Sequence, residues 1–141
     1  TEKRSMEGNE IVTVRQSRPL AGQAAHVANL SLLYKNTKHG LNAQLTGSYI
    51  GKRLADVSNW YLNDIWENEY FRMELSAEKS WHSGLELYLK ATNLLNLPLI
   101  RYIMKGPHTE AVSDFPRYRG NIYERKERYG QTLMIGVRYK L

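Results

Sequence analysis

The feature that most constrains the fold is a strict alternation of apolar and polar residues, which recurs in five stretches of the chain. Successive side chains of a β-strand point to opposite faces, so a period of two is typical of strands and not of helices. In residues 41–51 one face carries Leu41, Ala43, Leu45, Gly47 and Tyr49, and the other carries Asn42, Gln44, Thr46 and Ser48. The pattern predicts an all-β protein, an antiparallel meander of about five long strands.

The expected strands are residues 25–36, 41–51, 69–79, 85–93 and 130–141, with residues 10–16 as a possible sixth. Their apolar faces are almost purely aliphatic. The opposite faces are strongly polar, and we expect the charges of the third and fourth strands to form cross-strand pairs: Arg72, Glu74, Glu78, Glu86 and Lys90. A soluble antiparallel sandwich alternates in the same way, so the alternation by itself leaves both readings open.

The connections between these strands run short, long, short, long. The short ones are turns at 36–40 and 80–84, and the long ones are loops at 52–68 and 94–123. Bacterial outer-membrane barrels have short periplasmic turns and long extracellular loops. The expected strands are also close to the ~9–11 residues that cross a bilayer at a tilt. The sequence therefore divides into residues 1–24, a loop and possible strand end, and residues 25–141, barrel strands with two short turns and two long extracellular loops.

Closure sets a further condition on this interpretation. In lipid every strand edge must be paired, and closed bacterial barrels begin at about eight strands. Five or six strands cannot close. We therefore expect these residues to be the C-terminal portion of a large outer-membrane β-barrel, and we expect the isolated segment to self-associate through its edges and aliphatic faces.

Composition excludes several other classes. The mean hydropathy is negative and no run of ~18 apolar residues occurs, which excludes a helical membrane protein. The absence of Cys excludes disulfides, thiolate catalysis and Cys-based zinc sites. The net charge of +6 comes from scattered residues, which suits a barrel lumen, loops and rims better than a nucleic-acid interface.

Three segments, in the same order, resemble TonB-dependent outer-membrane receptors, particularly those of Bacteroidetes. Arg18-Pro19-Leu20-Ala21-Gly22-Gln23, leading into His26-Val27-Ala28-Asn29-Leu30, resembles the RPLxGQ…VN segment that enters a late strand. Leu87 to Asn96 contains the "NLLN" element that precedes the final extracellular loop. Tyr129 to Leu141 looks like the terminal strand. Together the segments cover roughly residues 18–141.

The resemblance implies a 22-stranded barrel with a plugged lumen in the outer membrane of a Gram-negative bacterium. It also implies energised uptake of a scarce ligand such as a siderophore, haem, cobalamin or a glycan. The implied partners are outer-membrane lipid, the barrel-assembly machinery, and the TonB complex through an N-terminal region that these residues do not include. The assembly signal would be Ile135, Val137, Tyr139 and Leu141, although family members often end in Phe or Trp.

Candidate ligand-binding residues lie in the two long loops. The first loop carries Trp60, Tyr61 and Trp66, for which interfacial anchoring or loop packing is the plainer alternative. In the second, a stretch interleaves aromatic and basic residues, a chemistry that suits sugars, catecholate siderophores or single-stranded nucleic acid. Its candidates are Arg117, Tyr118, Arg119 and Tyr123. Glu124 and Glu127 dilute the positive charge, so we do not expect nucleic acid as a partner; an ordinary loop remains the alternative.

His108 follows Met104 in the second loop and could ligate haem iron or a metal, although a solvated loop histidine is the simpler reading. No pair of histidines has metal-site spacing, and we expect neither a metal nor another cofactor. No nucleophile elbow, phosphate-binding loop or triad order occurs, so we expect no enzyme. The leading hypothesis is transport. The alternatives are a soluble all-β module that binds glycan or nucleic acid through the aromatic-basic loop, and a non-transporting outer-membrane anchor.

Overall fold

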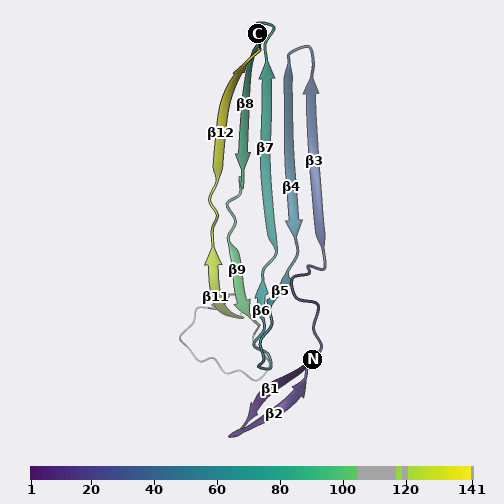
Figure 1. Ribbon diagram of the computed structural model, residues 1–141, viewed down its shortest axis with the longest axis vertical. Coiled ribbons are helices and arrows are strands. Elements are labelled where there is room, and N and C mark those ends of the chain that lie inside the picture. Colours follow the sequence, from purple (N-terminus) through teal and green to yellow (C-terminus); the bar gives the residue numbers. More distant parts are fainter. Residues whose placement is uncertain (105–116, 119–120, 141) are drawn as a thin grey trace. The chain divides into compact units, whose positions relative to one another are not determined.

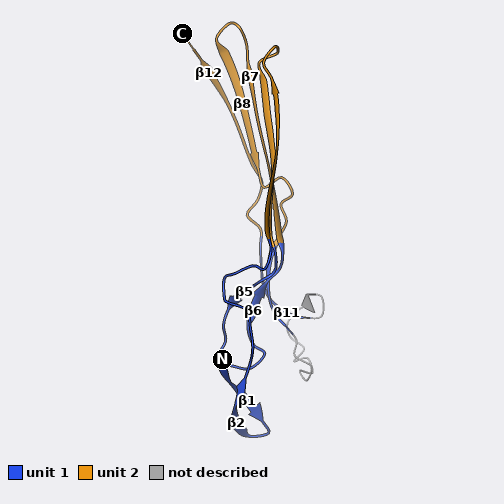
Figure 2. Ribbon diagram, turned by 90° about the vertical axis from the view of Figure 1, so that its right-hand side faces the viewer, with its two compact units in different colours: residues 1–26, 51–69, 99–127 blue, residues 27–50, 70–98, 128–141 orange. Residues whose placement is uncertain are grey.

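The computed structural model describes residues 1–104, 117–118 and 121–140, and in these residues it contains β-strands and no helix. Accordingly, that part of the chain holds no helix with the length and hydrophobicity that a membrane span requires. The strands divide into two compact units, which Figure 2 distinguishes by colour. The all-β, antiparallel class predicted from the alternation is confirmed.

The unit formed by residues 27–50, 70–98 and 128–141 is one antiparallel sheet of five strands. Its strands lie side by side in the order β12-β8-β7-β4-β3 (Figure 1). Their bounds are β3 Val27–Asn36, β4 Leu41–Ile50, β7 Tyr70–Ser80, β8 Leu85–Thr92 and β12 Thr132–Tyr139. All five long strands predicted from the sequence are confirmed, with ends shifted by two residues at most. The sheet is not a closed barrel: among the described strands, β3 and β12 each have one neighbour.

Two tight turns join these strands at one end of the sheet, where the sequence predicted them. Gly40 closes the β3–β4 turn with a φ of 60°, and a Cβ at this position would collide with the backbone carbonyl of Ser80. The close approach allows the Ser80 amide to donate a hydrogen bond of 2.8 Å to the Gly40 carbonyl. In the same way the Lys140 amide donates to the Gly84 carbonyl in the β7–β8 turn, at 2.9 Å. The two turns and the end of β12 therefore form a continuous row.

The other unit consists of residues 1–26, 51–69 and 99–127. It holds a hairpin, β1 Glu2–Glu7 with β2 Glu10–Arg15, and a sheet in the order β10-β11-β9-β6-β5. The strands of that sheet are β5 Arg53–Asp56, β6 Ile65–Glu67, β9 Leu99–Ile103, β10 Arg117–Tyr118 and β11 Asn121–Glu127. The possible strand at residues 10–16 is confirmed as β2.

The prediction that residues 52–68 and 94–123 are irregular is wrong in part, because β5, β6, β9, β10 and the start of β11 lie within them. These strands are short, and two of them carry register shifts, between Leu54 and Asp56 and between Tyr123 and Arg125. A bulge adds an unpaired residue and so breaks the period of two on which the sequence prediction rested.

The two units differ in how they bury side chains. In the described part of the unit that contains β1, the buried hydrophobic residues are Leu54, Ile100 and Tyr102. In the five-stranded sheet only Ala91 is a buried hydrophobic residue among those described. The sheet is a single layer, so in water its large aliphatic side chains would lie exposed on one face.

Candidate functional site

The five-stranded sheet has one face that is apolar across all its strands. The register places Leu32, Leu45, Leu75, Ala91 and Leu133 in one cross-strand row, and Tyr34, Ala43, Ala77, Leu89 and Ile135 in the next. The sequence predicted which residues of each strand share a face, and the register now shows that the five apolar faces coincide. A one-residue slip in any strand would place its polar residues on this face, so the shared face fixes the register.

The apolar face is open, most of all along the two edge strands. The exposed fractions are 68% for Leu30, 60% for Leu32, 64% for Leu133 and 61% for Ile135. Most side chains of the inner strands β4 and β7 are half-buried, because neighbouring strands of the same sheet flank them on both sides. A soluble monomer rarely leaves a contiguous apolar surface larger than about 300–600 Å² uncovered, and a face of this extent needs a covering medium or partner.

Aromatic side chains lie at both ends of the apolar face. At one end Tyr49 of β4 pairs directly with Phe71 of β7. At the turn end Tyr139 of β12 pairs with Leu85, and Trp81 follows in the adjoining β7–β8 turn with 43% of its surface exposed. Tyr and Trp suit positions where one side is apolar and the other wet, which is where the aliphatic rows stop.

The opposite face is polar, and its charges are concentrated toward the turn end. Glu86 is 4% exposed and forms ion pairs with Arg138 of the neighbouring β12, whose Nε lies at 3.1 Å, and with Lys140 just after it, whose Nζ lies at 3.6 Å, while Ser80 Oγ donates to its carboxylate at 3.0 Å. The expected cross-strand pairing is therefore confirmed for Glu86. Arg72 instead approaches Glu74 on its own strand, at 3.9 Å.

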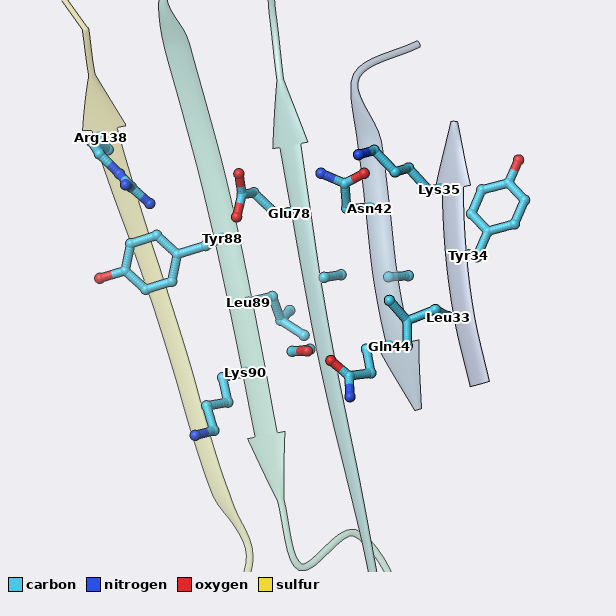
Figure 3. Close-up of a pocket in the computed structure, with 13 residues that line it drawn as sticks. Leu33, Tyr34, Lys35, Asn42, Gln44, Glu78, Tyr88, Leu89, Lys90 and Arg138 are labelled. Atoms are coloured by element: carbon cyan, nitrogen blue, oxygen red, sulfur yellow. The ribbon is translucent and has the colours of Figure 1, made fainter. Parts of the chain in front are cut away.

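A shallow hollow of about 530 Å³ lies on this polar face between β3 and β12 (Figure 3). Its lining includes Lys35, Asn42, Glu78, Lys90 and Arg138. These charged groups of both signs and the amide share the lining of the hollow with apolar groups such as Leu33 and Tyr88, whereas the other side of the same strands is almost purely aliphatic. The two faces therefore suit two different media.

Tyr88 and Gly136 approach each other closely on the polar face. They are direct cross-strand partners, and the Tyr88 ring extends from β8 over β12 (Figure 3). The ring fills the space that a Cβ at residue 136 would occupy. Gly136 is thus required by close approach, and the sequence alone gave no signal for this pair.

The NLLN element is an ordered connection at the end of β8. Asn93 and Asn96 both have positive φ, 54° and 45°, and the Asn96 amide donates to the Asn93 carbonyl at 3.0 Å. Asn93 is 5% exposed; its amide donates to the Gly130 carbonyl and its Oδ1 accepts from Tyr70 Oη at 3.4 Å. Asparagine tolerates the left-handed conformation better than most residues, which explains its presence at both positions.

In the other unit, the predicted ligand residues Trp60 and Tyr61 lie on a loop that is held firmly. Trp60 is 40% exposed and Tyr61 38% exposed. The Tyr61 amide donates to the Arg4 carbonyl at 2.8 Å, and the Arg4 amide donates to Asn59 at 2.9 Å. Nearby, Leu62 has a φ of 58°, which is rare for a leucine.

A buried ion pair anchors this loop to the hairpin. The ammonium of Lys3 contacts Asp64 Oδ1, and the two side chains are 1% and 4% exposed. Asp64 Oδ1 also accepts the Ser58 amide at 2.9 Å. Breaking such a pair by removing one partner is costly, since it leaves a buried charge without compensation. Sequence reasoning missed both residues because they are far apart in the chain.

Of the remaining predicted ligand residues, Trp66 and Tyr123 lie in one cross-strand row on either side of Tyr102. Trp66 pairs with Leu54 and Tyr102, both buried, and Lys52 Nζ lies 5.2 Å from the centre of its ring. Tyr123 of β11 pairs with Tyr102. The backbones of Arg117 and Tyr118 form β10, whereas His108 and Arg119 lie outside the described residues. The described part of the chain brings no group of three or more His, Cys, Asp or Glu side chains together as a metal site.

Arg101 of β9 is the charged centre of the β5–β6–β9–β11 sheet. Its guanidinium contacts Asp56 and lies 3.6 Å from Glu124 and 3.8 Å from Glu67. Partial burial alone would lower the pKa of Arg101, but the hydrogen bond to Asp56 and the attraction of the other carboxylates raise it above its ordinary value. Arg101 therefore stays positively charged at every accessible pH.

Of the residues in the predicted assembly signal, Ile135, Val137 and Tyr139 lie on the apolar face of β12, in cross-strand pairs with Leu89, Leu87 and Leu85. Leu141 lies outside the described residues. The alternation of β12 thus continues the apolar rows to the edge of the sheet.

The chain matches no family model, no curated protein and no solved structure.

Proposed function

We propose that the five-stranded sheet is part of the wall of an outer-membrane β-barrel, with its apolar face toward lipid and its polar face toward the lumen. The observation that carries this proposal is the apolar face that runs across all five strands of a single-layer sheet, with aromatic residues at both ends and one charged residue, Lys79, at the turn end. Transmembrane barrels have an outward apolar band flanked by aromatic girdles and a polar interior.

The dimensions agree with a bilayer. Phe71 and Trp81, at the two ends of the band, are ten residues apart along the chain. At ~3.3 Å per residue this separation is about 33 Å along the strand, and a tilt of ~40° reduces it to about 25 Å across the membrane, the height of the apolar band in outer-membrane barrels.

The barrel we propose is that of a TonB-dependent receptor, which takes up a scarce ligand such as a siderophore, haem, cobalamin or a glycan. The support for this finer assignment is the sequence resemblance over residues 18–141, with the NLLN element at its centre. In such a barrel residues 51–69 and 99–127 are the connections opposite the tight turns, on the extracellular side. The anchored loop with Trp60 and Tyr61 would then be a place for ligand contact.

Site-directed labelling tests the orientation of the two faces. The native sequence has no Cys, so each introduced thiol is unique within these residues. We would introduce Ile135→Cys on the apolar face and Met134→Cys, its neighbour on the polar face, in the full-length protein in outer-membrane preparations. Spin labels at the two positions report accessibility to oxygen, which partitions into lipid, and to a polar nickel chelate, which does not.

We expect the label at residue 135 to be accessible to oxygen and protected from the chelate, and the label at residue 134 to be accessible to the chelate. Equal access of the chelate to both positions would contradict the membrane orientation and favour a soluble all-β module. Protection of both positions from both reagents would instead indicate a protein partner on the apolar face.

A further inference from the structure

The turn end of the five-stranded sheet carries a cluster of cations and an indole beside the apolar face. We refer to Lys38, His39, Lys79, Trp81 and His82 as the turn rim. Lys79 is the unusual member because the register places it on the apolar face, between Leu41 of β4 and Leu87 of β8. A lysine with a leucine on each side, on a face that is otherwise apolar in β7, calls for an explanation.

The ammonium of Lys79 is held at the rim but is not neutralised. It donates to the His39 carbonyl of the adjacent turn and lies 5.6 Å from the centre of the Trp81 ring. An ammonium has three donors, and only one is used in this hydrogen bond. Trp81 is itself fixed, since its amide donates to the Leu85 carbonyl at 2.9 Å.

No carboxylate opposes these cations within the two turns. Residues 36–41 and 79–85 contain Lys38 and Lys79 and neither Asp nor Glu. The acidic side chains that flank this stretch, Glu78 and Glu86, both lie on the polar face, where Glu86 is engaged by Arg138 and Lys140. The hydrogen bond from the Ser80 amide to the Gly40 carbonyl keeps the two turns side by side, so their positive charges add.

We propose that the turn rim binds the phosphate of an anionic phospholipid headgroup, with the ammonium of Lys79 as its main contact and Lys38 as a second. This inference rests on the proposed function, because the rim lies at a membrane surface only if the apolar face lies in lipid. Charge complementarity identifies the occupant: clustered lysines beside a membrane attract anionic lipids, and an indole suits the headgroup level. A lysine that only extends its ammonium to water would not distinguish headgroups by charge.

The test compares two lysines that lie near the turn end of the sheet, one on each face. Lys79→Met removes the charge from the apolar face, and Lys35→Gln, on the polar face, is the matched control. Each full-length variant is equilibrated with an equal mixture of phosphatidylglycerol and phosphatidylcholine, and native mass spectrometry gives the ratio of the two lipids retained. We expect Lys79→Met to lower the ratio about fivefold, as for one lysine near an anionic surface, Lys79→Arg to restore most of it, and Lys35→Gln to leave it unchanged.

An unchanged ratio in Lys79→Met, or an equal fall in Lys35→Gln, would overturn the inference. If Lys79→Met does not assemble, Lys38→Gln provides the same comparison, and the same two outcomes decide. Excess inorganic phosphate should not displace the retained phosphatidylglycerol; displacement would identify a site for free phosphate and contradict the proposal. Failure of the proposed function is distinguishable, because the accessibilities of residues 134 and 135 report the membrane orientation independently of the lipid ratio: an unchanged ratio in Lys79→Met with residue 135 protected from the chelate contradicts this inference alone.

Discussion

The substitution Leu75→Arg should distinguish a sheet whose apolar face lies in lipid from one whose apolar face lies in water. Leu75 belongs to β7, the middle strand of the sheet, with Leu45 and Ala91 as its cross-strand neighbours on the apolar face. It lies beside the midpoint between Phe71 and Trp81, which places it near the centre of the proposed bilayer. The matched control is Ser76→Arg, one residue further along on the polar face.

The expected magnitude follows from this position. An arginine on the lipid face of an outer-membrane barrel costs about 2–4 kcal/mol at the bilayer midplane and about 0–1 kcal/mol near the interface. Leu75→Arg should therefore lower the free energy of unfolding by about 2–4 kcal/mol. Leu87→Arg, near the interface, should cost about 0–1 kcal/mol for its depth, with a smaller like-charge cost added because the arginine would directly oppose Lys79. If the apolar face were in water, arginine would be well solvated there and the cost would fall within about 0.5 kcal/mol.

The assay is equilibrium unfolding by guanidinium chloride of the full-length protein reconstituted in lipid vesicles. Differences in the free energy of unfolding come from the midpoint and slope of each transition. We expect Leu75→Arg to lower the free energy of unfolding far more than Leu87→Arg or Ser76→Arg. Equal costs for residues 75 and 76, or no cost at residue 75, would refute it.

Three further substitutions test individual contacts, the first two by the same unfolding measurement and the third by limited proteolysis. Gly136→Ala places a methyl group against the Tyr88 ring and should cost about 1–3 kcal/mol, most of which Tyr88→Leu in the same chain should recover; no recovery would show that the ring is not the obstacle. Asn93→Ala removes two hydrogen bonds from a buried residue with positive φ and should cost about 1–3 kcal/mol, whereas an effect as small as that of an exposed residue would disprove the anchoring role. Lys3→Met leaves Asp64 charged and buried, which should cost about 3–5 kcal/mol locally and appear as faster proteolysis of residues 57–64. The double variant Lys3→Met/Asp64→Leu should be cleaved more slowly than Lys3→Met. Equal cleavage of the single and double variants would count against the ion pair.

The sequence predicted the five-stranded sheet well because a physical period defined it. In β4, every second residue from Leu41 to Tyr49 is apolar or glycine, and the observed strand, Leu41–Ile50, differs from the prediction by one residue. The short strands were missed for the opposite reason. β6 has three residues, and β5 and β11 contain register shifts, so no window within them is long enough to reveal a period of two.

The contacts that define the site could be predicted only where they depend on strand register. The alternation of β8 and β12 puts Glu86 and Arg138 on the polar face, so an ion pair between the two strands was predictable in kind. The connection between these strands is long, and the exact partner of Glu86 came from the observed register. The pair of Lys3 and Asp64 joins segments 61 residues apart and has no local pattern. The NLLN element could be recognised in the sequence, but the burial of the Asn93 amide and its hydrogen bonds became visible only in the structure.

Among the described strands, β3 and β12 form the two edges of the five-stranded sheet. Lipid cannot satisfy the outer amide and carbonyl groups of β3 and β12, so a membrane wall must continue on both sides. The rows already present dictate what a neighbour of β3 must offer: an apolar side chain opposite Leu30 and Leu32, and a polar one opposite Ser31. Opposite Lys35 a carboxylate is favoured, since the part of the chain described here supplies none to it directly and like charges across a pair destabilise. If one face of the sheet lies toward lipid and the other toward the lumen, as we propose, the rows of the sheet restrict its neighbours residue by residue.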